Sequence, residues 1–415
     1  MIPVNTALIE FAAYRPYNPK ATKQDEAFGA PHYVAYVIRR QGDVQWKELG
    51  EAKVIDAVID NWRKALRDPK RKDVKALARV VDEKTMQPLR PLLGAATQLL
   101  ISPESALNLI PFPALVNETG QYLVERYAIS YLTSGRDLLR LQVARESQSP
   151  PLVLAYPEFG EGEMIQRATA PTSKRAAQTR QGISPATDLT SLYFTALKQP
   201  EDKKYDEAKS IQSNFPTATV LTETFANETA LKQVKSPRIL HIATHGFFLT
   251  DQKIEASHNT GAVLGINLHV KIENPLLRSG LALAGANLRK ESNDDGILTA
   301  MEMANLNLWG TKLVTLSACE TGVGEVKIGE GVYGLRRALV LAGAESQVMS
   351  LWKVSADKTP DLMIDYYAGL KQGQGRGEAL RQAQLKMLRN KALQHPFFWA
   401  GFIQSGEWAN LDGKR

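Results

Sequence analysis

Two short, mostly apolar runs constrain the fold of this chain more than any other feature of its sequence. Residues 239–244 and 313–318 are rich in Leu, Ile, Val and Ala. Runs of this length are typical of strands buried on both faces of a parallel sheet. Apolar residues at helical spacing precede the first run, at 205–215, and follow the second, at 332–342. This alternation predicts an α/β fold in which helices cover both faces of a parallel sheet.

The chain divides into two expected halves, residues 1–145 and residues 146–415. The second half opens with a strand at 151–156, and its polar stretch at 160–188 predicts a mobile surface loop. In the first half we expect strands at 6–15, 32–40, 44–49, 98–102, 122–124 and 127–132 and helices at 51–66 and 74–93. In the second half we further expect strands at 218–221, 280–284, 347–351 and 397–403 and helices at 228–234 (capped by Asn227), 298–306, from Thr359 onward and at 378–388.

Composition favours a soluble globular protein of two or three domains. The 415 residues are 44% hydrophobic and carry a net charge of +7. No apolar run reaches the length of about 18 residues that a membrane span needs, and the first residues do not resemble a signal peptide. A single cysteine excludes an internal disulfide, so we expect a reducing, cytoplasmic setting. We interpret the densest basic stretch, 63–79, as a solvated face and expect no direct binding of nucleic acid.

Each apolar run ends in a side chain with nucleophile or base chemistry. Cys319, the only cysteine, ends the second run, and His245 followed by Gly246 ends the first. A histidine that takes the thiol proton activates a cysteine nucleophile, and the N–H groups of Gly246 and Cys319 would form an oxyanion hole. The residues alone leave open that Cys319 is a small buried apolar side chain. The rival base, His241, lies within the first run, and we interpret it as a packed group that supports the site indirectly.

The motifs around these residues resemble the CHAT family. The resemblance rests on 241–248 (HIATHGFF) and 315–322 (TLSACETG), and it continues through 107–112, 122–126, 280–285, 295–302, 329–331 and 351–357. CHAT proteins are caspase-like cysteine peptidases, related to separases and often joined to tetratricopeptide repeats. The resemblance implies that His245 is the base, Cys319 the nucleophile and Gly246 an oxyanion donor.

The resemblance also implies an architecture. We expect a caspase-like three-layer sandwich with a mostly parallel sheet of about six strands in residues 146–415. Residues 1–145 would form an N-terminal α/β half, an inactive caspase-like subdomain packed beside the active one. No tandem tetratricopeptide segment is evident in the sequence, so a regulatory partner or a repeat region outside this chain is expected.

Substrate preference has three candidate residues. Asp357 follows the strand at 347–351. The run that contains it is similar to a separase segment whose aspartate receives a basic P1 side chain, although the spacing within the run is one residue longer here. Asp294 and Asp295 are rival candidates for the same S1 pocket. An equally good explanation of Asp357 is a negative charge near a helix N-terminus that interacts with the helix dipole. Glu320 is expected to point away from the thiol, because a neighbouring carboxylate raises a thiol pKa.

Together these features predict a bacterial, cytoplasmic cysteine endopeptidase that cleaves a specific protein after a basic residue. We expect no cofactor and no metal, because metal-ligand spacing is absent from the sequence. We expect control by a partner protein, with the stretch at 160–188 as a candidate gate or processing segment. The alternatives are a catalytically silent caspase-like scaffold, and a nucleotide-binding α/β domain suggested by the glycines after Cys319, which lack P-loop spacing.

Overall fold

A computed structural model describes residues 2–23, 26–143, 145–161, 192–197, 205–248, 275–288, 294–320 and 328–414. The expected loop at 160–188 therefore lies almost wholly outside the described residues, and its interpretation stays a prediction. The strands are β1 (Thr6–Tyr14), β2 (His32–Arg39), β3 (Gln45–Glu51), β4 (Gln98–Ser102), β5 (Ala128–Tyr131), β6 (Leu152–Pro157), β7 (Thr219–Glu223), β8 (Ile239–Phe248), β9 (Ser279–Ala282), β10 (Ile297–Thr299), β11 (Leu313–Glu320), β12 (Ser346–Ser350) and β13 (Phe402–Gly406). The α-helices are α1 (Ala52–Leu66), α2 (Val74–Thr85), α3 (Arg90–Leu93), α4 (Leu123–Arg126), α5 (Asp137–Arg140), α6 (Asp206–Asn214), α7 (Glu228–Lys232), α8 (Ala300–Met303), α9 (Ile328–Ala342), α10 (Thr359–Lys371), α11 (Arg376–Arg389) and α12 (Pro396–Trp399).

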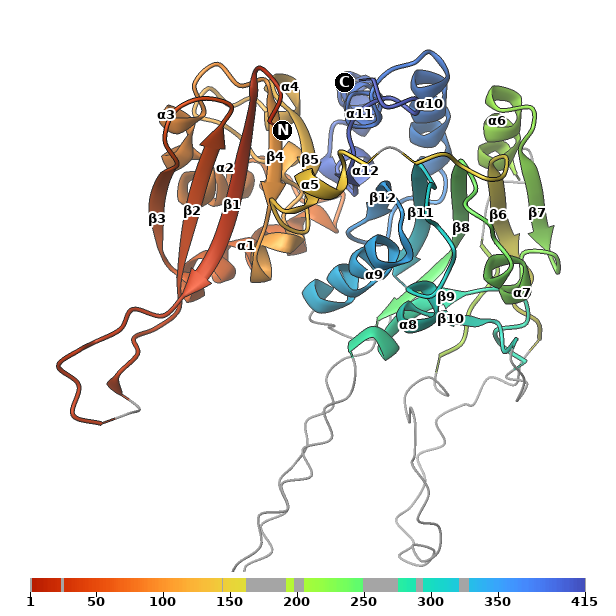
Figure 1. The fold of residues 1–415 in the computed structure, drawn as a ribbon, viewed down its shortest axis with the longest axis horizontal. Coiled ribbons are helices and arrows are strands. Elements are labelled where there is room, and N and C mark those ends of the chain that lie inside the picture. The colour runs from red at the N-terminus through yellow and green to blue at the C-terminus, as the bar shows by residue number, and fades with distance from the viewer. Residues whose placement is uncertain are drawn as a thin grey trace, which may run out of the picture.

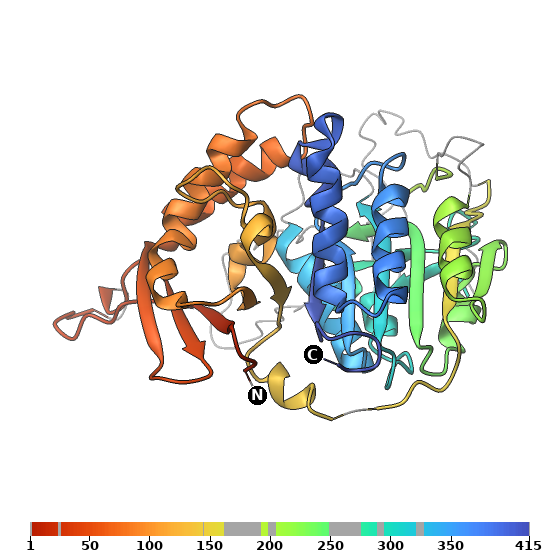
Figure 2. The ribbon, with the colours of Figure 1, turned by 90° about the horizontal axis from the view of Figure 1, so that it is seen from above.

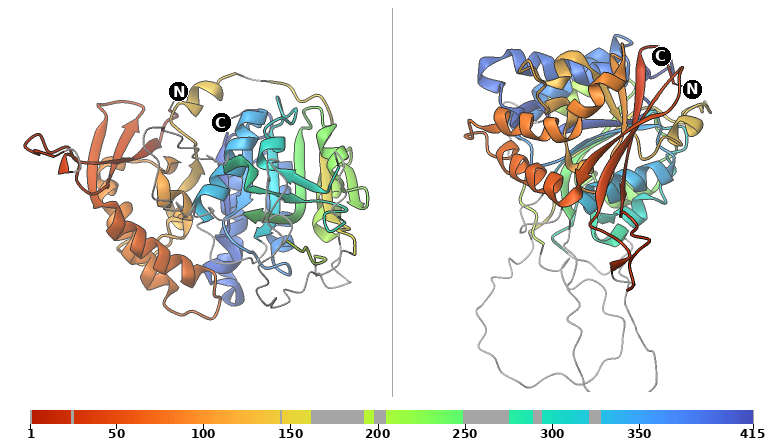
Figure 3. Two further views of the ribbon diagram at one scale, coloured as in Figure 1. Left: turned by 90° about the horizontal axis from the view of Figure 1, so that it is seen from below. Right: turned by 90° about the vertical axis from the view of Figure 1, so that its left-hand side faces the viewer.

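The fold is a layered α/β structure around a mostly parallel sheet (Figure 1), as the sequence predicts. In its C-terminal half, β7, β6, β8, β11 and β12 are parallel neighbours and β13 is antiparallel to β12. Helices α6, α10 and α11 cover one face (Figure 2), and α9 lies on the other (Figure 3). This two-sided cover explains why β8 and β11 are apolar almost throughout.

The sheet does not stop at the expected six strands. From β13 it continues through β5, β4, β1, β2 and β3, so the described residues form one 13-stranded sheet. The junction is narrow, because β13 and β5 meet through the single register pair Ser405–Tyr131. The division into residues 1–145 and 146–415 stays a prediction.

Helix α9 forms where the helical spacing of apolar residues predicts a helix. Of the predicted apolar face, Leu335, Ala338, Leu339 and Ala342 are buried. Gly343 follows the helix with φ of 103°, a conformation that glycine adopts at little cost and that ends a helix. The predicted cap at Asn227 is also confirmed, since its side chain accepts the Ala230 N–H at 2.9 Å.

Four predicted elements differ from the structure. The helix predicted at 74–93 is interrupted after Thr85 by a 3₁₀ turn at Gln87–Leu89, whose proline precedes α3.

The other three differ for a local reason at a helix start. Residues 122–124 are not a strand, because Glu125 accepts the Tyr122 N–H at 2.7 Å and starts α4. The helix predicted at 298–306 is shortened, because Thr299 and Glu302 form a reciprocal cap that confines it to α8, after β10.

The last of these errors concerns the aromatic segment at 397–403. His395 Nδ1 accepts the Phe397 N–H at 3.1 Å, and Pro396 occupies the first helical turn of α12. The strand β13 therefore begins only at Phe402.

Candidate active site

His245 and Cys319 are neighbours at the carboxyl edge of the sheet. Strands β8 and β11 are adjacent and parallel, and residues 245 and 319 are register partners within them (Figure 1). Ligand and active sites of parallel sheets form at this edge. The side chains of residues 318–320 lie outside the described part of the structure, so the expected orientation of Glu320 stays a prediction.

The His245 imidazole packs against two aromatic rings, which also pack against each other with centroids 5.9 Å apart. Phe159, just after β6, stacks on it with ring centroids 5.3 Å apart and planes at 29°. Phe194 stacks with centroids 6.2 Å apart and planes at 23°. Both rings belong to a small apolar cluster that also contains Phe247. The ring is thereby fixed in an apolar setting.

A backbone carbonyl determines the tautomer of His245. Nε2 lies 2.7 Å from the Thr195 carbonyl oxygen, which can only accept, so Nε2 carries the proton. Nδ1 then bears the lone pair. It is buried, and no described atom hydrogen-bonds to it. An imidazole in this state is ready to accept a proton at Nδ1.

This setting lowers the pKa of His245 below the ordinary histidine value. Burial of the ring is the main cause, the hydrogen bond to Thr195 opposes it, and the positive charge of Lys353 adds to it. His245 is therefore neutral around pH 7, as a general base must be.

We expect NMR titration of the histidine rings to place the midpoint of His245 below about pH 6.5. Because the folded pKa is depressed, the unfolded chain binds this proton first as the pH falls. The contribution of neutral His245 to the free energy of unfolding is thus complete above about pH 6.5 and is lost as the pH falls towards the folded pKa. The variant His245→Gln assigns the signal. A midpoint at or above that of an unfolded histidine would contradict this account of the pocket.

Gly246 lies between two strands. It is in register with Glu320 of β11 on one side and with Leu281 of β9 on the other, and it is buried. Its backbone therefore runs beside that of Cys319 at the same edge. The oxyanion role of the two N–H groups stays a prediction.

His241 lies deeper on β8, in a buried polar network. Its ring is fully buried, Nε2 lies 3.2 Å from a Glu207 carboxylate oxygen of α6, and Nδ1 lies 2.9 Å from the Tyr367 hydroxyl of α10. Tyr367 in turn donates to the Thr315 hydroxyl of β11 at 2.9 Å. His241 is thus a packed group that joins two helices to the two strands of the site.

The three candidate S1 aspartates have local partners. Asp294 accepts hydrogen bonds from the N–H and hydroxyl of Thr229, in the first turn of α7. Asp295 accepts the Ile297 N–H at 2.8 Å, and partial burial raises its pKa. Asp357 lies in the turn before α10, half exposed, with Lys358 Nζ at 3.0 Å. Their part in substrate binding stays a prediction.

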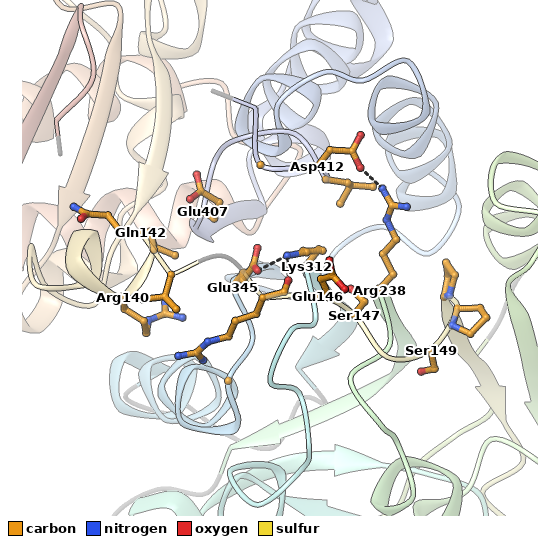
Figure 4. Close-up of a pocket in the computed structure, with 18 of the residues that line it drawn as sticks. Arg140, Gln142, Glu146, Ser147, Ser149, Arg238, Lys312, Glu345, Glu407 and Asp412 are labelled. Atoms are coloured by element: carbon orange, nitrogen blue, oxygen red, sulfur yellow. Dashed lines mark hydrogen bonds and ion pairs between the residues drawn. The ribbon is translucent and has the colours of Figure 1, made fainter.

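A cavity of about 1090 Å³ lies at the opposite edge of the sheet. Its lining includes Arg238 and Lys312, the residues that precede β8 and β11. Figure 4 shows these cations paired with Asp412 and Glu345. Because parallel strands present their carboxyl ends to the active site, this cavity is separate from His245 and Cys319.

The described residues offer neither a metal-binding cluster nor a membrane-spanning helix. They contain no group of three or more His, Cys, Asp or Glu side chains placed to hold a metal ion. Within the same residues, every helix is too short or too polar to cross a membrane.

Sequence reasoning missed three residues that build this site. The Thr195 carbonyl has no side-chain signature, and Phe159 and Phe194 flank a long polar stretch that hides their proximity to β8. A pair of isolated aromatics at the two ends of that stretch was the available signal.

The CHAT domain profile matches residues 75–407, and the chain belongs to the CHAT domain family. The resemblance expected from the two strand-end motifs is thereby confirmed. The chain is 24% identical over 330 residues to human tetratricopeptide repeat protein 28. That alignment covers 77% of this chain and 12% of the human protein, so the chain spans only a small part of its relative.

Two solved structures resemble the fold distantly. The separase–securin complex of Saccharomyces cerevisiae gives a TM-score of 0.39 at 12% identity, over 89% of this chain and 21% of that chain. The Arg-specific cysteine proteinase gingipain R gives a TM-score of 0.41 at 8% identity, over 86% of this chain and 74% of that chain.

Proposed function

We propose that this protein is a cysteine endopeptidase with Cys319 as nucleophile and His245 as general base. The observation that carries the proposal is the state of His245: a partly buried, neutral imidazole with its Nε2 proton fixed by Thr195, in register with the only cysteine. A free thiol is mostly protonated near pH 7, so it needs such a base to become a nucleophile.

The proposed reaction has two halves. In the first, Nδ1 of His245 takes the proton from the Cys319 thiol, and the sulfur attacks the scissile carbonyl carbon. The N–H groups of Gly246 and Cys319 receive the negative charge on the carbonyl oxygen. The tetrahedral intermediate collapses, the amine leaves with the proton from His245, and a thioester remains. In the second half, His245 deprotonates water, which attacks the thioester and releases the acid and the thiol.

We further propose a basic residue at P1, with Asp357 as its acceptor and Asp294 or Asp295 as the alternatives. The Asp357 side chain is half exposed, and Lys358 Nζ lies 3.0 Å from it, so a substrate guanidinium can reach the carboxylate and compete with that contact. Asp294 is already engaged at the start of α7 through Thr229.

Regulation by a tetratricopeptide-repeat region or by another protein partner is part of the proposal. The name of the human relative supports it, because that protein carries such repeats by name, and most of its length lies outside the alignment. The cytoplasmic setting also belongs to the proposal.

A panel of fluorogenic peptides with Arg, Lys, Asp, Asn or Leu at P1 tests the activity and its preference. We expect cleavage after Arg and Lys, and none by Cys319→Ala. Asp357→Asn is expected to lower kcat/KM for the Arg peptide about 30-fold, the lower limit for truncating one partner of a desolvated charge pair. Asp361→Asn, a change in the first turn of α10, is the matched control and is expected to leave the preference unchanged.

The panel also separates the proposal from its rival. Equal cleavage after Arg and Leu, or an Asp357→Asn variant with unaltered preference, would contradict the assigned S1 residue. No cleavage, together with a Cys319 that reacts no faster than an ordinary thiol, would favour a silent caspase-like scaffold.

A further inference from the structure

We propose that Asn287 is a positioning residue that holds the Thr195 carbonyl against His245. Its catalytic consequence rests on the proposed function, but its effect on the histidine ring does not. Asn287 lies in the turn after β9 and is almost fully buried, with 6% of its surface exposed.

Asn287 uses three of the four hydrogen-bonding positions of its side-chain amide on two other segments of the chain. Its Oδ1 accepts the Phe194 N–H at 2.9 Å, and its Nδ2 donates to the Phe194 carbonyl at 2.9 Å and to the Gly160 carbonyl at 3.0 Å. Its own backbone N–H donates to the Phe159 carbonyl at 2.8 Å. Two carbonyls on one nitrogen and an N–H on the oxygen fix the orientation of the amide. One residue therefore ties together the two segments that carry Phe159 and Phe194, whose rings hold His245.

The position of Thr195 follows from that of Phe194. The Phe194 C=O belongs to the planar peptide unit before Thr195, and the Phe194 N–H belongs to the unit before that, so the two hydrogen bonds hold both units in place. The Thr195 carbonyl belongs to the following peptide unit. Only the two backbone dihedral angles of Thr195 set the orientation of that unit relative to the one before it. That carbonyl lies 2.7 Å from His245 Nε2. Asn287 thus acts on the histidine through one intervening residue.

The turn that presents Asn287 is itself tightly constrained. Within it, Ala286 and Leu288 donate backbone hydrogen bonds to Leu283 and Gly285. Gly296, with φ of 79°, packs so closely on this turn that an added Cβ would lie 2.4 Å from the Ala286 nitrogen. A rigid support of this kind is what a positioning residue needs.

The isosteric variant Asn287→Leu tests the effect on the ring directly. In protein labelled with ¹⁵N-histidine, the wild-type Nε2–H of His245 is expected as a slowly exchanging signal, because it is hydrogen-bonded to the Thr195 carbonyl. Asn287→Leu is expected to lose this protection and to move the His245 titration up towards the ordinary histidine value, since burial is the main cause of its depression. Asn117→Leu is the matched control, because Asn117 is equally buried and bonds a turn in the N-terminal half.

Activity gives the second readout. In a peptidase, Asn287→Leu is expected to lower kcat about 10- to 100-fold with little change in KM, the cost of misplacing a reacting group by about 1 Å. Asn287→Asp keeps the bond from the Phe194 N–H but loses both donated bonds, so it serves as the milder variant if the leucine variant does not fold. It is expected to lose part of the protection and part of kcat.

The outcomes separate this inference from the proposed function. A lost Nε2–H signal in a protein without peptidase activity supports the positioning role and ends the peptidase proposal. An unchanged signal and titration in a folded Asn287 variant overturns the positioning role, whether or not the wild type cleaves peptides. A loss of activity equal to that of Asn117→Leu, with the histidine signal intact, also overturns it.

Discussion

Replacing His245 with alanine is expected to lower kcat/KM for a cleaved peptide about 10²- to 10⁴-fold, the usual contribution of a positioned general base. The reason is the single lone pair on Nδ1, which Thr195 leaves free by fixing the proton on Nε2. Without it, the thiolate must form unaided, and a thiol with a pKa near 8.5 supplies only a few per cent near pH 7. Steady-state kinetics on the best peptide measures the loss.

The control for this prediction is another histidine. His32 lies on β2 with Nδ1 at 2.7 Å from Glu48, within the N-terminal half of the sheet. His32→Ala is expected to keep wild-type kinetics. A His245→Ala enzyme as active as wild type would mean that another group takes the thiol proton.

Glu207→Leu is expected to lower the free energy of unfolding by about 3–5 kcal/mol, the cost of removing one partner of a buried ion pair and leaving the other behind. Glu207 is 3% exposed and His241 is fully buried, so water cannot replace the lost carboxylate. The change leaves Nε2 of His241 facing an apolar side chain. Urea unfolding followed by circular dichroism gives the difference.

Two comparisons show whether the pair itself is responsible. The double variant Glu207→Leu with His241→Leu is expected to be more stable than the single variant, because it removes both polar partners and leaves the bond between Tyr367 and Thr315 intact. Asp365→Ala removes an exposed pair with Lys386 and is expected to cost at most about 1 kcal/mol. A Glu207→Leu protein as stable as Asp365→Ala would show that the buried network contributes little.

The helices and strands that bury an apolar face were predictable from the sequence, because a buried face requires apolar residues at a regular spacing. The runs at 239–244 and 313–318 became β8 and β11, and the apolar face of α9 is buried as expected. Composition could not show that β8 and β11 are neighbours. Their adjacency depends on the long-range sheet order, to which no local pattern points.

The errors and omissions have two physical causes. Short helices that begin at a cap, such as α4 and α12, depend on one backbone N–H that donates to Glu125 or His395, and this hydrogen bond outweighs β propensity in a few residues. The support of His245 comes from the Thr195 carbonyl and the Asn287 amide. These groups belong to segments distant in sequence, and they come near His245 only when the chain is folded.

The pH dependence of Cys319 alkylation tests the central claim most directly. With one cysteine in 415 residues, uptake of a small alkylating reagent by intact mass spectrometry reports a single thiol. The account predicts that wild-type protein reacts well below the pH at which an ordinary thiol of pKa about 8.5 ionises, and that His245→Ala shifts the profile back to that value. Superimposable wild-type and His245→Ala profiles, both centred near pH 8.5, would contradict it.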